Sequence, residues 1–577
     1  MVLHETKYLL AEGLHQADYA VLGLYLVVIT LIGIWAARKI KSSDDFFMPR
    51  KFGKIFMIFF SFGSGTHSDQ AVNVAAKSFT NGLSGIWYQW LWLPVTPFYW
   101  LIAPVMRRFR AITTGDVFEA RFNPSVAMLF SFFGMLSLAV QMGLMLKGSG
   151  AVVSASIGGA FSANLVIFIM TVMFVIYGVA GGLAAAIITD FIQGVLTIIF
   201  SFLLLPFVMN AIGGLQGMRE GISDPGMLSI VAPGEIGLFY IIIIAFNALV
   251  GIVVQPQTMG NCAAGKTELE GRIGFMLGTF LKRICTIPWC LTGVAAIVYF
   301  AGREIEPDAV FGTIAGDFLP KILPGMLGIF IAAILASVMS TCDAFMISSS
   351  ALFTENLYKK LEPAKTQKHY ILVGRIASII VVAAGVGFAY WMEGVISGLQ
   401  IVWKVASMMG IAFWLGLFWR RATSAGAWAA TLTSFAALLF TSKIGAGNIV
   451  LWDFNESLAH KLPEFMVWEG KLYLPWQMVI YLSVGLIAGV VVSLLTKPVS
   501  EEKLDKFYAL LRAPIQPDEK ITEACTLPEG AQVLPKKNLI SWGGLEIPVP
   551  TVQSILGFLG GWVMIAAIIY VVYMIAN

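Results

Sequence analysis

Residues 61–72, SFGSGTHSDQAV, interrupt what would otherwise be a membrane-spanning helix. The apolar run KIFMIFF at 54–60 precedes them, and they are rich in glycine, serine and threonine. Irregular backbone at membrane depth persists only where protein or a water-filled cavity satisfies its polar groups. Gly63 and Gly65 allow the helix to unwind, so we expect freed carbonyls to bind a cation and nearby side chains to contact a solute.

The composition is that of a polytopic membrane protein. Hydrophobic residues make up 58% of the 577 residues and charged residues 12%, whereas soluble domains carry about 25% charged residues. The net charge of +4 is small and the basic residues lie in loops, which does not indicate a nucleic-acid partner. The five cysteines have no paired spacing, so neither a disulfide framework nor a metal cluster is predicted.

The whole chain is predicted to be one all-α transmembrane domain over residues 1–577. Runs of about 18 or more apolar residues are typical of transmembrane helices. We expect about 14 such spans, at residues 18–37, 54–77, 82–105, 124–147, 163–181, 183–210, 236–258, 273–300, 322–355, 369–391, 394–419, 424–443, 475–496 and 552–575.

Lysine and arginine gather in alternate loops, after the first, third, ninth and eleventh spans, while the opposite loop 211–235 contains few. By the positive-inside rule the basic loops are cytoplasmic. This predicts a multi-pass protein of the plasma (cell inner) membrane with both termini outside. The charged, proline-rich segment 497–551 is then a cytoplasmic loop before the last helix, with an amphipathic helix near 500–512. We expect a solvated linker there rather than a regulatory element.

A second span is also broken. The span 236–258 runs into Gln255, Pro256 and Gln257, five spans after the first break. Paired interrupted helices at corresponding positions of two halves are typical of inverted-repeat transporters. The two breaks therefore predict a transporter whose binding site lies near the middle of the membrane.

Ser337, Ser340 and Thr341 follow i, i+3, i+4 spacing in the ninth span and share one helix face. Their oxygens suit a hard, weakly charged cation, although serine and threonine also simply pack helices together in membranes. Asp343 flanks this face, about 60° round the helix. Asp190 lies in the otherwise apolar sixth span. A carboxylate at mid-membrane costs at least ~2.5 kcal/mol and indicates function, the alternative being a structural salt bridge.

Other polar residues fall in predicted spans. Lys282 either pairs with a carboxylate or faces a solute, and His67 can titrate or donate a hydrogen bond. Gln70 and Gln89 are uncharged, double-ended hydrogen bonders that suit polyols or amides. The aromatic residues within 82–100 include candidates for a sugar-stacking ring, but a lipid-facing role is the more common one. The sequence has no nucleotide-binding loop and no nucleophile–base motif, so neither a primary pump nor an enzyme is predicted.

Longer motifs resemble those of a known family. They are DYAVLGLYLVVITLIGIWAARKIKSSDDFFMPRK at 18–51, GGLAAAIITDFIQ at 181–193, GTFLKRICTIPW at 278–289, ASVMSTCDAFMISSSALFTENLY at 336–358 and GLFWRRATSAGAWAA at 416–430. Over about residues 18–500 the chain resembles the sodium:solute symporters, which include the sodium/glucose cotransporters and the sodium/proline symporter. The resemblance implies a LeuT-type fold of two inverted five-helix repeats, here at about 54–210 and 236–419.

The resemblance also implies a sodium site. Its members are the carbonyls of Gly63, Thr66 and Ser337 and the hydroxyls of Ser340 and Thr341. Ser337 stands where some members have alanine, a harmless change if only its carbonyl binds.

Two positions depart further from the family. Gly65 stands where relatives have asparagine or aspartate, which leaves His67 as the polar side chain beside the site. Some members bind a second sodium ion with the residue matching Asp190 and with hydroxyls at two positions that read Asp343 and Ala344 here. Asp343 is thus either a ligand for a second cation or a proton, or a structural partner.

For the solute, sugar-carrying members offer residues that match Gln70, Gln89, Lys282 and Gln400, with Gln89 replacing a carboxylate. This set resembles a sugar site, while Lys282 and His67 also suit an organic anion. The resemblance therefore implies a secondary active transporter that couples inward sodium flux to uptake of a small polar solute, with sugar favoured. The alternatives are symport of an organic anion or amino acid, and a non-transporting solute sensor on the same fold. Sodium is the only cofactor expected, as the co-transported ion.

Overall fold

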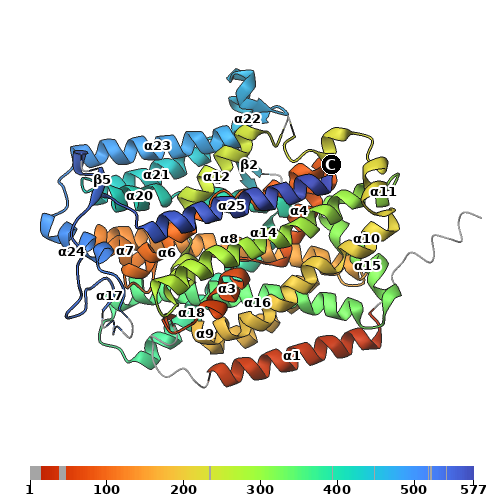
Figure 1. The fold of residues 1–577 in the computed structure, drawn as a ribbon, viewed down its shortest axis with the longest axis horizontal. Coiled ribbons are helices and arrows are strands. Elements are labelled where there is room, and N and C mark those ends of the chain that lie inside the picture. The colour runs from red at the N-terminus through yellow and green to blue at the C-terminus, as the bar shows by residue number, and fades with distance from the viewer. Residues whose placement is uncertain are drawn as a thin grey trace, which may run out of the picture.

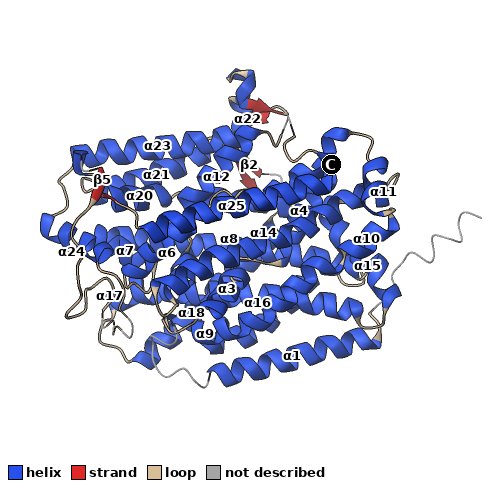
Figure 2. Cartoon of the chain, in the orientation of Figure 1, coloured by secondary structure: helices blue, strands red, loops and turns tan. Residues whose placement is uncertain are grey.

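The computed structural model is a bundle of long helices whose axes lie close to one direction (Figures 1 and 2). The structure describes residues 14–37, 47–232, 235–392, 394–446, 449–516, 519, 521, 523–540 and 542–576. Its helices are α1 (Gln16–Ala37), α3 (Lys54–Gly63), α4 (Ser68–Asn81), α5 (Trp87–Trp90), α6 (Thr96–Arg108), α7 (Thr114–Arg121), α8 (Pro124–Ser156), α9 (Ala163–Leu203), α10 (Leu205–Ala211), α11 (Gly214–Gly221), α12 (Leu238–Ile252), α13 (Pro256–Ala263), α14 (Glu268–Tyr299), α15 (Val310–Ile322), α16 (Met326–Phe353), α17 (Lys359–Leu361), α18 (Gln367–Trp391), α19 (Val395–Ser407), α20 (Gly410–Phe418), α21 (Ser424–Phe440), α22 (Phe454–Ser457), α23 (Leu474–Leu495), α24 (Glu501–Arg512) and α25 (Val552–Ala576).

The prediction of an all-helical chain holds for the bundle but not for its loops. Three short antiparallel hairpins lie outside the long helices: β1 (Lys443–Ala446) with β2 (Ile449–Asp453), β3 (Val467–Trp468) with β4 (Lys471–Leu472), and β5 (Asn538–Ile540) with β6 (Ile547–Pro548). Figure 1 shows α7, α17 and α24 at one end of the bundle, which we call the α24 end, and α11 and the C-terminus at the other.

Both predicted helix breaks are present. The first separates α3 from α4, and the second separates α12 from α13, which meet at an angle of 71°. Pro256 is the first residue of α13, where its missing N–H costs no helical hydrogen bond. Ser64, at the first break, donates a 2.9 Å hydrogen bond from its hydroxyl to the amide oxygen of Asn261 in α13. The two breaks therefore lie side by side.

Fewer helices are long enough to cross a bilayer than the 14 spans that the sequence predicts. Among the described residues, eight helices are long and apolar enough to cross a bilayer, or nine if α12 and α13 count as one bent span. Shorter apolar helices, including α3 and α21, fail only the length test. The sequence predicts two separate spans at 163–181 and 183–210. The structure has no boundary between them, because α9 is one helix of 41 residues from Ala163 to Leu203.

Two long helices position the first break. α16 is buried along nearly its whole length and packs on α1, α8, α9 and α18, while α14 packs on α3, α4 and α6. Gly278 of α14 faces the backbone of α3 so closely that a Cβ there would lie 2.5 Å from the carbonyl oxygen of Ile58 and 3.0 Å from the nitrogen of Phe62. Small residues of this kind let helix backbones approach in membranes.

The segment after residue 497 differs from the solvated linker that the sequence predicts. The amphipathic helix near 500–512 is present as α24, but its apolar residues Leu504, Phe507, Tyr508 and Leu510 are buried against the bundle. Phe507 stacks on Phe109 with ring centroids 5.4 Å apart. The charged composition of the segment did not reveal this docking, because all of the buried apolar residues lie on one face of a short helix.

The close contact at Gly278 generates a first prediction. Gly278→Ala is expected to lower the thermal unfolding temperature by several degrees, because overpacking of this kind costs ~1–3 kcal/mol and the opposing atoms are backbone. Gly387→Ala on α18, where a Cβ meets nothing within 4 Å, is the matched control. Equal unfolding temperatures for both variants in detergent would contradict this packing of α14 on α3.

Candidate ion and solute site

The break between α3 and α4 is a short non-helical stretch, Ser64–His67. The amide of Ser64 still donates to the carbonyl of Phe60 at 2.8 Å, and that of Thr66 donates to Gly63 at 3.3 Å. α4 begins with His67 as its N-cap, and the His67 side chain makes no capping bond. The carbonyl end of one half-helix and the amide end of another thus meet at the same depth, and their dipoles favour a cation and an anion respectively.

Hydroxyls of α16 meet the carbonyls that the break frees. Thr341 donates to the carbonyl of Gly63 at 3.0 Å, and it also lies 3.2 Å from the carbonyl of Ser337. The hydroxyl of Ser337 lies 3.5 Å from the carbonyl of Thr66. A Cβ on Gly63 would lie 2.6 Å from the hydroxyl of Ser340. The five residues expected to bind sodium therefore form one cluster of oxygen atoms, all of a kind that hard cations prefer.

Asp190 of α9 joins this cluster from the side. Its carboxylate accepts a 2.5 Å hydrogen bond from Ser340, and its second oxygen has no hydrogen-bond partner although the residue is fully buried. One turn further along α9, Gln193 donates to the hydroxyl of Tyr25 in α1 at 3.4 Å. Asp343, also buried, is close enough to Tyr25 for an electrostatic interaction. Asp190 thus borders the oxygen cluster, and Asp343 lies near Tyr25, which Gln193 also contacts.

Predicted solute residues converge on the carbonyl of Gly65. The Gln70 amide donates to it at 2.9 Å, and the Lys282 ammonium makes a short hydrogen bond to the same oxygen. His67 forms a short hydrogen bond with Asp69, and its other ring nitrogen lies 3.1 Å from the Gln70 amide. Asp69 was not predicted as a site residue; its position two residues after His67, in the first turn of α4, was the available signal.

Gln89 and Gln400 lie apart from this carbonyl. Gln89 is buried with neither amide atom hydrogen-bonded, and Gln400 of α19 lies next to the hydroxyl of Tyr88. The Tyr88 ring packs against Trp403 of α19 at 5.4 Å, and Trp403 packs against Trp92 at 6.4 Å.

The sequence predicted mainly lipid-facing roles for the aromatic residues of 82–100. That is wrong for Trp87, Tyr88 and Trp90, which are buried in the protein. Trp92 is also engaged inside the bundle, since the Lys282 ammonium lies 5.6 Å from its ring centroid. Aromatic-rich composition cannot tell an interfacial belt from a helix that turns inward, because both patterns use the same residues.

The charge of the solute region is positive. Lys282 and Arg283 are buried and adjacent, and neither forms an ion pair with a carboxylate of the described residues. Arg283 instead donates to the backbone carbonyl of Gln89 at 2.5 Å. Asp69 is the carboxylate that acts on Lys282 electrostatically, and it is already paired with His67. A buried cation without a counterion is costly, so an anionic solute would relieve it.

A small cavity of about 20 Å³ lies on the α24 side of this cluster. Its inner wall includes Phe60 of α3 and Ala344 of α16, each one turn from the oxygen cluster, together with Gln257 of α13. Phe47 and Met48 lie at its far side. The cavity therefore lies between the depth of the breaks and the α24 end.

The chain is similar to a known family of membrane proteins. The family described as the sodium:solute symporter family matches residues 46–434. The chain belongs to the sodium:solute symporter family. The resemblance read from the sequence motifs is thus confirmed, and this family membership makes the protein a multi-pass membrane transporter with sodium as its co-transported ion.

Relatives of this symporter are named for different solutes. The sodium/pantothenate symporter of Haemophilus influenzae is 27% identical over 77% of this chain and 94% of its own length. The osmoregulated proline transporter OpuE of Bacillus subtilis is also 27% identical, over 82% and 94%. The sodium/glucose cotransporter of Vibrio parahaemolyticus is 24% identical over 74% and 86%.

A solved structure supports the fold of the symporter. The substrate-bound, outward-open structure of a Na⁺-coupled sialic acid symporter matches with a TM-score of 0.69 at 20% identity, over 84% of this chain and 99% of that one. The helix arrangement is therefore shared, while the solutes of the relatives belong to those proteins.

The contact between Gly63 and Ser340 generates a second prediction. Gly63→Ala is expected to abolish the rise in thermal unfolding temperature that sodium gives over potassium, because the new methyl group would displace the Ser340 hydroxyl. Gly65→Ala is the control, since a Cβ there first meets the Ser61 carbonyl at 3.4 Å. Retention of the full sodium effect in Gly63→Ala would remove Gly63 and Ser340 from the ion site.

Proposed function

We propose that this symporter couples inward sodium movement to uptake of a small organic anion by alternating access. The observation that carries the ion part is the cluster of Gly63, Thr66, Ser337, Ser340 and Thr341 oxygens between the broken helix and α16. Unwound carbonyls of discontinuous helices are the usual cation ligands in transporters of this architecture.

Sodium binding at this cluster would join α3 and α4 to α16. The ion replaces the hydrogen bond between Thr341 and the Gly63 carbonyl, so both oxygens become ligands. The break is then fixed in one conformation, and the neighbouring Gly65 carbonyl presents Gln70 and Lys282 to the solute. Each sodium ion that moves down a potential of 100 mV supplies ~2.3 kcal/mol, in addition to its concentration gradient.

The alternating movement takes place between two inverted five-helix repeats, at about 54–210 and 236–419, within a LeuT-type fold of about 14 spans. The side-by-side position of the two breaks supports this arrangement. In this proposal the α24 end is cytoplasmic, both termini are outside, and the protein lies in the plasma (cell inner) membrane.

The charge of the site favours a carboxylate over the sugar that the motifs favour. Among the described residues, Asp69 is the carboxylate that acts electrostatically on Lys282, and the free amide end of α4 points into the same region. A carboxylate near Lys282 would neutralise this excess. The Trp92 and Trp403 rings, packed edge to face, supply an apolar corner for the rest of the solute.

A sugar is the second candidate. The Gln89 amide is buried without partners, and Gln70 has an unpaired amide oxygen. These groups, with Gln400, suit hydroxyls that both donate and accept.

Asp190 and Asp343 are candidates for a second coupled ion. The unpaired oxygen of Asp190 and the hydroxyl of Ser340 lie beside the first cluster. Sodium or a proton at this position would offset the cost of buried negative charge.

Sodium dependence gives the third prediction. Ser340→Ala combined with Thr341→Ala is expected to abolish sodium-driven uptake into vesicles, because both hydroxyl ligands are lost. Ser349→Ala, whose hydroxyl bonds only within α16 to Met346, is the control. Unchanged sodium-driven uptake in the double variant would sink the assignment, and binding without any uptake in the unmodified protein would favour a solute sensor.

Solute class gives the fourth prediction. A thermal-shift panel of monocarboxylates, amino acids, sugars and choline, each in sodium and in potassium, is expected to show stabilisation by a monocarboxylate in sodium only. Lys282→Gln is expected to remove that shift and Lys282→Arg to keep part of it. A shift with a sugar that survives Lys282→Gln would retire the anion proposal and leave the ion site standing.

A further inference from the structure

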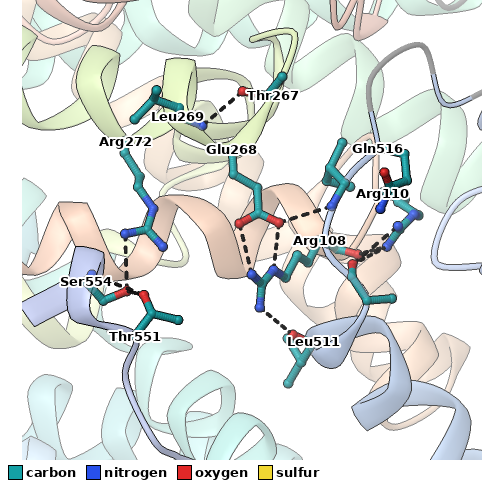
Figure 3. A network of polar contacts seen from close by, with 12 residues as sticks. Arg108, Arg110, Thr267, Glu268, Leu269, Arg272, Leu511, Gln516, Thr551 and Ser554 are labelled. Atoms are coloured by element: carbon teal, nitrogen blue, oxygen red, sulfur yellow. Dashed lines mark hydrogen bonds and ion pairs between the residues drawn. The ribbon is translucent and has the colours of Figure 1, made fainter. Parts of the chain in front are cut away.

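A buried arginine cluster lies at the α24 end, outside the site already described. Arg108, the last residue of α6, donates two hydrogen bonds of 2.8 and 3.0 Å to Glu268 at the start of α14. It also donates to the carbonyl of Leu511 in α24 at 2.8 Å, and Glu268 accepts from the amide of Ile515 at 3.1 Å. Figure 3 shows Arg108 held between Glu268 and Leu511. One ion pair thus ties two bundle helices to the segment after α24.

A second ion pair is more deeply buried. Arg110 binds Glu519 through hydrogen bonds of 2.5 and 2.9 Å, and the side chains are 0% and 4% exposed. Arg110 also donates to the carbonyl of Ala513 at 3.3 Å. The described residues 501–516 and 519, which we call the strap, are therefore fixed by their contacts with Arg108 and Arg110. Arg420 also pairs with Glu501 and Asp505 at the start of the strap.

Arg110 connects the strap to the cavity. Arg50 donates to the carbonyls of Arg110 at 3.1 Å and of Ala111 at 2.9 Å. Two residues before Arg50, Met48 lines the cavity together with its neighbour Phe47. The contacts thus run from Glu519 through Arg110 to Arg50, which lies two residues after the cavity-lining Met48.

The backbone of this connection is strained. Arg50 has φ of 42° and Arg110 has φ of 56°, in the left-handed region that non-glycine residues rarely adopt. Such conformations persist only where surrounding contacts hold them, and they concentrate at switch regions. The hydrogen bonds of Arg50 and Arg110 are the contacts that hold these two residues, so loss of the strap would let both relax.

The strap also spans parts of the bundle that an opening movement must separate. Lys503 donates to the carbonyl of Phe122 after α7 at 2.7 Å, and Tyr508 donates to the carbonyl of Gly416 in α20 at 3.0 Å. With Arg108 and Glu268, these bonds join α6 and α7 of the first proposed repeat to α14 and α20 of the second.

From these contacts we infer that the strap, residues 501–516 with Glu519, is a latch that holds the cavity closed at the α24 end and is released when the ion pair between Arg110 and Glu519 breaks. Four arginines, at positions 50, 107, 108 and 110, gather here against Glu268 and Glu519. The Nε and Nη1 atoms of buried Arg107 have no hydrogen-bond partner. Loss of the Glu519 charge leaves the cluster strongly positive, which favours undocking.

The latch rests on the proposed transport function only in treating the cavity as the inward exit. The test is the labelling rate of a cysteine placed at Ser348, which lines the cavity. Cys525→Ser removes the one native cysteine that is not fully enclosed in the structure. A membrane-impermeant maleimide is applied to inside-out membrane vesicles in potassium, with no solute required.

Glu519→Gln is expected to raise the labelling rate of Ser348→Cys severalfold. Glu502→Gln is the control, because Glu502 on the same helix pairs only with exposed Lys506. Lys503→Gln, beside the control position, is the second release variant and is expected to act in the same direction even if Glu519→Gln does not fold. Labelling of both release variants at the rate of the parent would overturn the latch.

Sodium separates this inference from the proposed function. Addition of sodium to the parent is expected to change the labelling rate, since the ion fixes the broken helix. Faster labelling in the release variants with no sodium effect in the parent would support the latch and contradict the ion site. A sodium effect in the parent without faster labelling in the release variants would support the ion site and contradict the latch.

Discussion

The rest of the structure depends on one constraint, that the backbone exposed where α3 ends must find partners at membrane depth. The hydrocarbon core of a bilayer holds no water, so each carbonyl freed by the break needs a hydrogen-bond donor or a cation from the protein site. Thr341 and Ser337 meet this need in the structure. The same arrangement makes the break a cation site. Without sodium the hydroxyls donate hydrogen bonds to the freed carbonyls, and when sodium binds, hydroxyls and carbonyls together become its ligands.

This constraint also explains the packing. α16 must approach the break closely, which only a glycine at position 63 permits, and α14 must support α3 from the other side, which Gly278 permits. The second break lies against the first through Ser64 and Asn261. A movement of either half-helix therefore displaces residues of the ion cluster and the contact with Lys282. Through α3 it also reaches the cavity and the strap.

The sequence predicted the features that depend on local pattern. Short stretches of sequence were enough to predict both helix breaks, the family, and the shared face of Ser337 and Thr341. In each stretch the residue types have a single physical explanation. It did not predict the continuous α9, since a glycine-rich apolar run fits one long helix or two. It also missed the inward-turned rings near Trp92 and the docking of α24, because these depend on contacts between residues far apart in the chain.

Hydrogen exchange at the break tests the central claim most directly. The amides of Ser64 to Gln70 have few helical partners, so their protection reports whether the break is held in place. In purified protein without added solute, replacing potassium with sodium should slow exchange in the peptide covering 61–70 and in the facing stretch of α16 around Thr341. Equal exchange in both salts at these two segments would contradict sodium binding between the broken helix and α16.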